Sequence, residues 1–258
     1  MCFDDNARPP IESIAGGAVD AGPTTLRSED GTEFAAFAAR PAKPTGAGIV
    51  ILPDVRGLHP YFEELAMRYA EAGIDALAID YFARTAGLTP RGAGFDHNPH
   101  VPQTTWDNLA ADIRTAVSTL RSPEWSDGRA PTAIFTTGFC MGGRLTFLSG
   151  TLGLDLAGLI GFYGWPVGPS RNGTPAPADM AGAIASPVLA IWGGADQGIE
   201  RHVVREFEAA LDKAGVEHRS ITYPNAPHGF FDRHAEEHAA ASAAAWEETL
   251  AFIRARTA

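Results

Sequence analysis

Thr136-Thr-Gly-Phe-Cys-Met-Gly-Gly-Arg144 joins an apolar, β-branched run to the start of an apolar helical pattern. Residues 133–137 predict a buried strand, and residues 145–148 predict the beginning of a helix. Between them, Gly138-x-Cys140-x-Gly142 has the spacing of a nucleophile elbow, with sulfur in place of the usual hydroxyl. Its glycines remove β-carbons that would collide with the neighbouring strand and helix. The pattern therefore predicts a thiol at a helix N-terminus, where the helix dipole favours the thiolate.

Segments of strand and helix character alternate outward from this turn. We expect strands over 34–40, 48–53, 74–79, 133–137, 156–163, 187–192 and 217–223, and helices over 61–72, 105–120, 199–214 and 235–256. This alternation predicts an α/β fold, with a doubly wound, mostly parallel sheet and helices on both faces. Antiparallel strands are possible near the N-terminal edge, where 34–40 looks like an edge strand. We expect one domain over residues 1–258, with residues 1–23 as an irregular N-terminal arm.

Composition excludes several classes of protein. The net charge is −11, with 45% apolar and 20% charged residues, so a basic surface for nucleic acid is not expected. The acidic N-terminus is not a secretory signal, and no apolar run is long enough to span a membrane. With only Cys2 and Cys140, a disulfide framework is not implied, so a reducing, cytoplasmic location is predicted.

Cofactor and metal motifs are also missing from the sequence. The Gly-Gly pairs lack the residues of a phosphate loop and the spacing of a dinucleotide site. His97-x-x-His100 and His234-x-x-x-His238 stand without a cysteine cluster or a His-Glu-x-x-His motif, which favours solvated histidines. We therefore predict neither a cofactor nor a metal.

Three residues at the ends of predicted strands could form a catalytic triad. Cys140 follows the strand 133–137, Asp196 follows 187–192, and His228 lies in the loop before the last helix. Ligands of open α/β sheets bind at the carboxyl ends of strands, and the order nucleophile, acid, histidine is that of the elbow hydrolases. Here Cys140 would attack a carbonyl, His228 would move the proton, and Asp196 would orient the imidazole.

Backbone N–H groups are expected to hold the oxyanion that this attack creates. Met141, directly after the nucleophile, would supply one donor. The second should come from the loop after the strand 48–53, most plausibly from Val55.

Five motifs carry a family resemblance: Gly138–Arg144, Leu52–Gly57, Asp80–Arg84, Gly161–Gly164, and Asp196 with His228-Gly-Phe. With these, residues from about 30 to 256 resemble the dienelactone hydrolase family (carboxymethylenebutenolidases) of the α/β-hydrolase superfamily. The resemblance implies the α/β-hydrolase fold. It also implies hydrolysis of a lactone or activated ester through a Cys–His–Asp triad.

Further site residues follow from the resemblance alone. Asp54 matches a glutamate that partners the resting thiol; an N-cap or an ion pair with Arg56 is the structural alternative. Arg84 matches an arginine that binds the substrate carboxylate, and a solvated loop charge is its alternative. Tyr163 matches an aromatic hydroxyl lining the pocket, although a core tyrosine would be equally ordinary.

One position departs from the family pattern. The family's second carboxylate-binding arginine would stand four residues after His228, where this chain has Asp232. Either Arg233 takes over, or the site recognises its substrate differently. The long loops 85–102 and 164–177 are expected to flank the pocket and set specificity.

These observations favour a cofactor-independent hydrolase that opens a small-molecule lactone or ester through a thioester acyl-enzyme. A general short-chain carboxylesterase and a non-catalytic small-ligand-binding homologue remain alternatives, and a redox-sensing thiol is a weaker one. The sequence leaves the choice between monomer and homodimer open.

Overall fold

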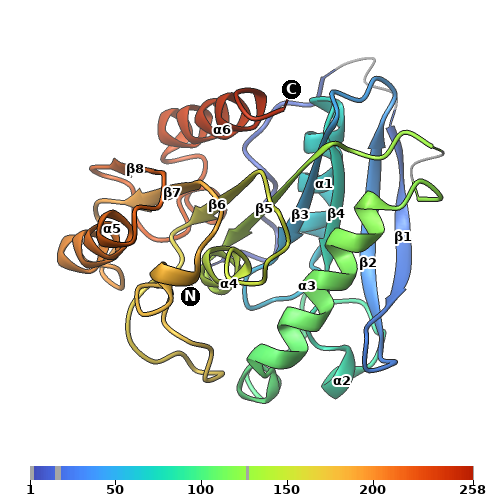
Figure 1. Cartoon of the computed structure of the whole chain (residues 1–258), viewed down its shortest axis with the longest axis horizontal. Helices are drawn as coiled ribbons and strands as arrows, with labels where there is room; N and C mark the ends of the chain where they lie inside the picture. Colours follow the sequence, from blue (N-terminus) through green and yellow to red (C-terminus); the bar gives the residue numbers. More distant parts are fainter. Residues whose placement is uncertain (1–2, 15–18, 126–127, 258) are drawn as a thin grey trace.

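The computed structural model describes residues 3–14, 19–125 and 128–257. Within these ranges eight strands form one sheet in the order β1-β2-β4-β3-β5-β6-β7-β8 (Figure 1). The strands are β1 (Val19–Arg27), β2 (Glu33–Pro41), β3 (Ala47–Leu52), β4 (Asp75–Ile79), β5 (Ala133–Phe139), β6 (Gly158–Phe162), β7 (Val188–Gly193) and β8 (His218–Tyr223). Strands β3 to β8 run parallel, whereas β2 is antiparallel to both β1 and β4. This arrangement confirms the predicted α/β fold and its antiparallel N-terminal edge.

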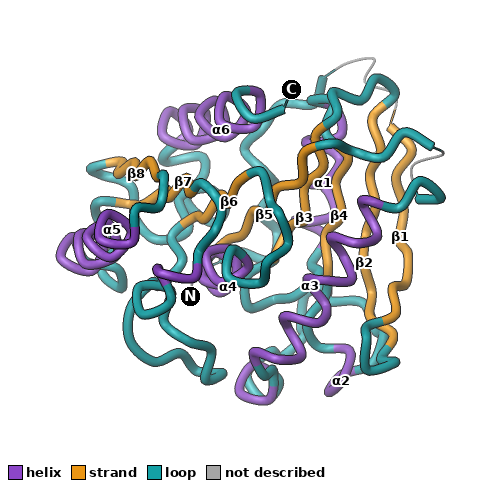
Figure 2. The backbone as a smooth tube through the Cα atoms, viewed as in Figure 1, coloured by secondary structure: helices purple, strands orange, loops and turns teal. Residues whose placement is uncertain are grey.

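Helices cover both faces of the sheet (Figures 1 and 2). They are α1 (Pro60–Glu71), α2 (Ala83–Ala86), α3 (Trp106–Arg121), α4 (Met141–Ser149), α5 (Arg201–Ala214) and α6 (Ala239–Arg254), with the 3-10 turns η1 (Val101–Gln103) and η2 (Ala181–Ala183). Helices α1 and α6 share one face, where the rings of Tyr69 and Trp246 meet edge-on at 4.8 Å. On the other face α4 and α5 meet through Phe147 and Phe207, whose ring centroids are also 4.8 Å apart.

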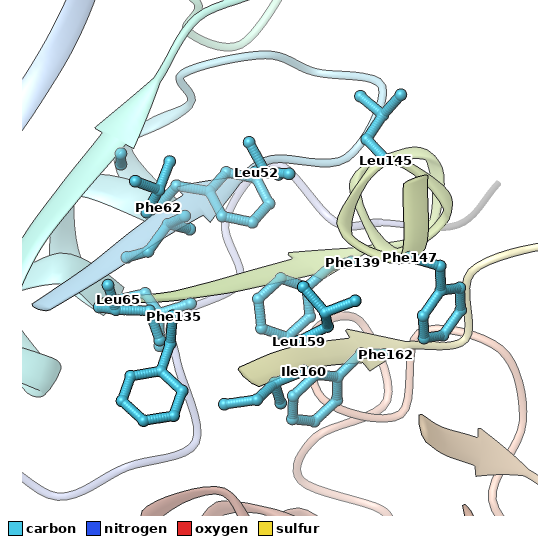
Figure 3. Packing of buried hydrophobic residues seen from close by; sticks show 14 of the residues in the cluster. Leu52, Phe62, Leu65, Phe135, Phe139, Leu145, Phe147, Leu159, Ile160 and Phe162 are labelled. Carbon is cyan, nitrogen blue, oxygen red and sulfur yellow. The ribbon is translucent and has the colours of Figure 1, made fainter. Parts of the chain in front are cut away.

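The centre of the sheet is buried on both faces. Every residue of β3 to β7 is buried, as the continuous apolar runs predict for strands between two helical layers. Phe139 at the end of β5 stacks on Phe162 of β6 at 4.6 Å and on Phe231 at 5.8 Å. Figure 3 shows the phenylalanines of β5 beside the apolar side chains of β6. This aromatic layer lies under the strand ends where the predicted site residues stand.

The N-terminal region differs from the expected irregular arm. Strand β1 begins at Val19 and pairs along its whole length with β2, so β2 is not the edge of the sheet. The sequence pattern does not predict β1, because it contains Gly22 and Pro23 and both residue types are rare in strand interiors. Pro23 is tolerated since β1 is itself the edge strand. Of the remaining arm, residues 1–2 and 15–18 lie outside the described ranges, and the prediction for Cys2 with them.

The expected loop 85–102 is also partly ordered into short helices. It begins within α2 and ends within η1. Between these turns Arg91, which is 2% exposed, pairs with Asp80 through Nε and Nη2 at 3.1 and 3.0 Å. Its guanidinium also lies over the ring of Phe95. A buried ion pair between residues 11 positions apart therefore organises a segment whose local sequence is typical of a loop.

Candidate active site

The turn between β5 and α4 has the geometry that its glycines predict. Cys140 is the N-cap residue of α4 and has φ 55° and ψ −112°, a backbone region that few non-glycine residues adopt. A β-carbon on Gly142 would overlap the carbonyl oxygens of Leu52 and Pro53. A β-carbon on Gly138 would overlap the carbonyl of Gly142. The close approach of β5, α4 and the end of β3 thus requires glycine at both positions, and it sets the thiol at the helix N-terminus.

His228 and Asp196 form a hydrogen-bonded pair. His228 Nδ1 lies 2.7 Å from Asp196 Oδ2, and the other carboxylate oxygen accepts from the N–H groups of Gly198 and Ile199 at 2.8 and 3.0 Å. Asp196 follows β7, and His228 lies in the loop between β8 and α6. The backbone of its own turn therefore fixes the carboxylate, independently of the hydrogen bond to the imidazole.

The electrostatics of this pair keep the carboxylate ionised. Burial favours the neutral acid, but the hydrogen bond and charge of His228, with the two backbone donors, outweigh it and lower the pKa of Asp196. An ionised carboxylate only accepts hydrogen bonds, so the proton between the two groups belongs to His228 Nδ1. His228 Nε2 is then the nitrogen that can exchange a proton with another group.

A cavity of about 660 Å³ brings most of the predicted site residues together. Its wall is made of residues from the segments that follow β3, β4, β5, β6, β7 and β8 in the chain. The lining residues are Val55, Val101, Cys140, Met141, Arg144, Tyr163, Trp165, Pro169, Ser170, Arg171, Asn172, Ala195, Asp196, Gln197, Gly198, Ile199, Pro227, His228 and Arg233. Cys140, Asp196 and His228, predicted from three separate segments, thus share one cavity.

The two expected oxyanion donors also border this cavity. Met141 is the first residue of α4, and the N–H groups of a helix's first turn have no acceptor within the helix. Val55 lies in the turn after β3, where the Gly57 N–H donates to the Asp54 carbonyl at 3.1 Å. Both residues therefore line the cavity that Cys140 also lines.

Asp54 does not line the cavity, because its carboxylate is bound by Arg56. The Arg56 guanidinium contacts Asp54 from Nε at 3.1 Å and from Nη2 at 2.9 Å, and the Arg56 N–H donates to the same carboxylate. Both side chains are about 95% buried. The structure therefore shows the ion pair that the sequence left as the alternative to a thiol partner.

Asp232 occupies the position of the missing arginine and pairs with Arg56 from the other side. Arg56 Nη2 donates to Asp232 Oδ2, and the N–H of Asp4 donates to Oδ1 at 3.1 Å. One buried cation thereby joins the turn after β3, the histidine loop and the N-terminal arm. Burial raises the pKa of Asp232 to about 6, and nearby Asp54 adds to the rise while Arg56 opposes it.

Two exposed arginines, Arg171 and Arg233, line the cavity. Arg233 lines it, as the sequence allowed, with its guanidinium hydrogen-bonded to His234. Arg171, from the segment after β6, was not singled out from the sequence. Its Nη2 donates to Asn98 Oδ1 at 3.2 Å. No local pattern marks an arginine in a Pro/Gly-rich loop as a pocket residue, and only its place in the fold does so.

The structure does not bring Arg84 to the cavity. Its guanidinium binds Asp112 of α3 with two hydrogen bonds of 2.7 and 2.9 Å, and Nε binds Asp30 at 2.9 Å. The expectation of a substrate-binding role therefore finds no support in this geometry, in which two aspartates hold the guanidinium outside the cavity. A bidentate arginine–aspartate pair leaves little of the guanidinium for another carboxylate.

Tyr163 lines the cavity and is 2% exposed. Its ring centroid lies 4.9 Å from that of His228, and burial raises its pKa well above the ordinary value. The side chain thus packs as a core tyrosine, and its ring contacts the imidazole at an interplanar angle of 56°.

The two long loops contribute unequally to the wall. The segment 164–177 supplies Trp165 and residues 169–172, whereas the segment 85–102 supplies Val101. The expectation that both loops flank the pocket is met mainly by the first. Trp165, 37% exposed, and Gln197, next to Asp196, are further residues of the cavity wall.

No cluster suited to a metal ion occurs in the described ranges. There, no group of three or more histidine, cysteine, aspartate or glutamate side chains converges. None of the helices described is long and apolar enough to cross a membrane.

Comparisons with known proteins agree with the fold. The model of the family described as "Dienelactone hydrolase family" matches residues 34–257. A protein of Salmonella typhimurium named "Putative carboxymethylenebutenolidase" is 28% identical, over 92% of this chain and 88% of its own length. A protein of the same name from Methylorubrum extorquens is 30% identical, over 87% and 76%. The crystal structure of a "Putative Dienelactone Hydrolase" from Klebsiella pneumoniae has a TM-score of 0.79, with 28% identity over 92% of this chain and 99% of that one.

Proposed function

The chain belongs to the dienelactone hydrolase family, and we propose that it hydrolyses small lactones or esters with Cys140 as the nucleophile. One observation carries this proposal. A thiol at the strained N-cap of α4 lines the same cavity as a histidine whose Nδ1 is held by a buried carboxylate at 2.7 Å. A nucleophile, a base and a group that orients the base are the parts that acyl transfer requires.

In the first half of the reaction Cys140 Sγ bonds to the carbonyl carbon. His228 Nε2 takes the thiol proton, and the carbonyl π electrons move onto oxygen, which the N–H groups of Met141 and Val55 stabilise. When the carbonyl re-forms, the carbon–oxygen single bond of the ester or lactone breaks. His228 gives its proton to the leaving oxygen, and the acyl group remains on Cys140 as a thioester.

In the second half water replaces the alcohol. His228 removes a proton from water, the hydroxide attacks the thioester carbonyl, and the carbon–sulfur bond breaks to release the acid. The sulfur leaves as thiolate or regains the proton from His228, so the enzyme returns to its starting state. Asp196 keeps its charge throughout and stabilises the imidazolium that forms twice per turnover.

The charges at the cavity favour a substrate that carries a carboxylate. Arg171 and Arg233 border the cavity from two different loops, and a guanidinium binds a carboxylate through parallel hydrogen bonds. Trp165 offers an aromatic surface beside them for a planar, unsaturated ring. A carboxylated, conjugated lactone fits these three side chains better than a neutral aliphatic ester does.

The test compares a carboxylated dienelactone with p-nitrophenyl acetate. Cys140→Ala should lose turnover of both substrates by roughly a thousandfold or more, because the residual rate then rests on binding and the oxyanion donors. Acid quenching during turnover should trap a mass increase on the Cys140 peptide. Retention of more than about a tenth of the wild-type rate in Cys140→Ala would exclude this mechanism.

Substrate recognition is tested with a matched pair of arginines. Arg233→Gln should raise KM for the carboxylated lactone roughly tenfold and leave the neutral ester almost unchanged, since one charged hydrogen-bonding partner is lost. Arg84→Gln is the control, because that guanidinium is bound to Asp112 and Asp30 outside the cavity. Equal rates on both substrates in every variant would favour a general short-chain esterase. Lactone binding without product in the wild type would favour a non-catalytic binding protein.

A further inference from the structure

Arg144 is a buried cation that no step of the proposed reaction uses. It belongs to α4, one turn after Cys140, and it is 3% exposed. Burial lowers its pKa to about 10, so the side chain stays positively charged at neutral pH. Within the described residues, no aspartate or glutamate lies within ion-pair distance of its guanidinium. A buried cation of this kind needs other polar partners to compensate for its lost hydration.

The segment 164–177 supplies those partners. Arg144 donates to the carbonyls of Trp165 at 3.0 Å, Gly168 at 2.9 Å, Thr174 at 2.9 Å and Pro175 at 2.7 Å. Its Nε donates to Thr174 Oγ1 at 3.1 Å. The guanidinium thus forms hydrogen bonds with the beginning, the middle and the end of one loop.

No helix or strand holds this segment in shape from Gly164 to Pro177, and it includes four prolines and three glycines. Besides the bonds to Arg144, Ser170 Oγ bonds to Asn172 and Thr174, and Asn172 Nδ2 donates to Thr104 Oγ1 at 3.1 Å. Yet it forms one wall of the cavity through Trp165 and residues 169–172. The position of Arg171, which we propose as a carboxylate ligand, therefore depends on contacts made on the buried side of the loop.

We propose that Arg144 is the positioning residue that sets substrate specificity, by holding the 164–177 wall against the helix that carries the nucleophile. The substrate class in this proposal rests on the proposed function. The role of Arg144 in holding the loop does not depend on it. Because Arg144 and Cys140 share the first two turns of α4, the wall is placed relative to the reacting sulfur and not merely closed over it.

Arg144→Lys is the main test, with Arg114→Lys as its matched control. Lysine keeps the charge, but its three donors leave from one atom and cannot reach all of the separate acceptors that the guanidinium binds. Arg114 also donates to a backbone carbonyl, that of Leu152 at 2.8 Å, but neither of these residues lines the cavity. The rate of tryptic cleavage after Arg171 reports on the local opening of this wall, since Arg171 is exposed on it.

In Arg144→Lys we expect tryptic cleavage after Arg171 to accelerate roughly tenfold or more, because release of several charged hydrogen bonds frees the loop. KM for the carboxylated lactone should rise roughly tenfold, while kcat for p-nitrophenyl acetate stays within about threefold. Arg114→Lys should change neither quantity. Unchanged cleavage, unchanged KM, or an equal fall of kcat on both substrates would each overturn the proposal.

Two additional measurements distinguish a failure of this proposal from misfolding of Arg144→Lys and from a failure of the proposed function. If Arg144→Lys does not fold, Thr174→Val removes one side-chain acceptor and should shift cleavage and KM in the same direction by a smaller factor. If the wild type turns over no ester, calorimetry in the Cys140→Ala background measures the dissociation constant of the carboxylated lactone. Arg144→Lys in that background should weaken binding, and equal binding with and without it would overturn the specificity role.

Discussion

Cys140 owes its position to backbone geometry more than to side-chain contacts. A non-glycine residue at φ 55° stores strain that the surrounding strands and α4 must hold in place. The imidazole partner is instead placed by side-chain chemistry, through the carboxylate of Asp196 and the ring of Tyr163. The site thus combines Cys140, which is positioned by backbone conformation, with His228, which is positioned by side-chain contacts.

Asp196→Asn should lower kcat on the order of 10³- to 10⁴-fold, because an amide both loses the charge and can hold the wrong tautomer of His228. The comparison of kcat for the variant and the wild type with p-nitrophenyl acetate measures this loss. Asp212→Asn provides the control, since Asp212 lies 3.9 Å from His218 in an aspartate–histidine pair outside the cavity. A loss below about tenfold in Asp196→Asn would show that His228 does not depend on this carboxylate.

The raised pKa of Asp232 predicts a pH-dependent stability. As pH rises from about 4 to about 6, the unfolded chain has released the Asp232 proton while the folded chain still holds it. The folded state then binds more protons, so the free energy of unfolding falls with rising pH in this window. Asp232→Asn should flatten this decline in urea titrations at pH 4, 5 and 6.

Asp75 contributes to the same slope, because burial raises its pKa to about 6 as well. The double variant with Asp75→Asn should therefore flatten the curve further than Asp232→Asn alone. An exposed aspartate, Asp179, serves as the control, and Asp179→Asn should keep the wild-type slope. An unchanged slope in the double variant would contradict the assignment.

The element that decides the site is the contact between β5, α4 and the end of β3. Local signals predict the elbow well, because the apolar run, the two glycines and the following helical pattern are adjacent in sequence. They predict β1 poorly, because Gly22 and Pro23 weaken its strand pattern. Pairing with β2, rather than the strand propensity of its own residues, stabilises β1. They also miss the short helices that bound the 85–102 segment, which Arg91 holds through a distant aspartate.

Gly142→Ala should lower the free energy of unfolding by about 3 kcal/mol or more, because its methyl group would overlap two backbone carbonyls that cannot turn away. Urea unfolding measures the change. Gly182→Ala is the control, since nothing lies within 4 Å of the added carbon there, and it should stay within about 0.5 kcal/mol of the wild type. Equal stability of the two variants would show that the elbow can relax.

At the scale of the whole molecule one apolar core runs through the sheet. It includes Leu26 of β1 and Ile253 of α6, so the first strand and the last helix of the fold pack into the same cluster. We propose that residues 1–258 form one cooperative domain. Circular dichroism at 222 nm and tryptophan fluorescence should then report coincident urea transitions, since Trp106 in α3 and Trp246 in α6 lie far apart in sequence. Two separated transitions would contradict this.

The sequence by itself determined the fold class, the elbow and the places of Cys140, Asp196 and His228, because each depends on residues that are neighbours in the chain. A buried strand followed by glycines, or a polar residue just after a strand, carries its meaning within a short window.

Only the tertiary structure decided what the charged residues do. Arg84 meets Asp112, Arg56 meets Asp232, and Arg144 meets the 164–177 segment, all across long separations in sequence. A guanidinium binds whichever acceptors the fold brings to it, so its partner is a property of the packed molecule and not of its local sequence.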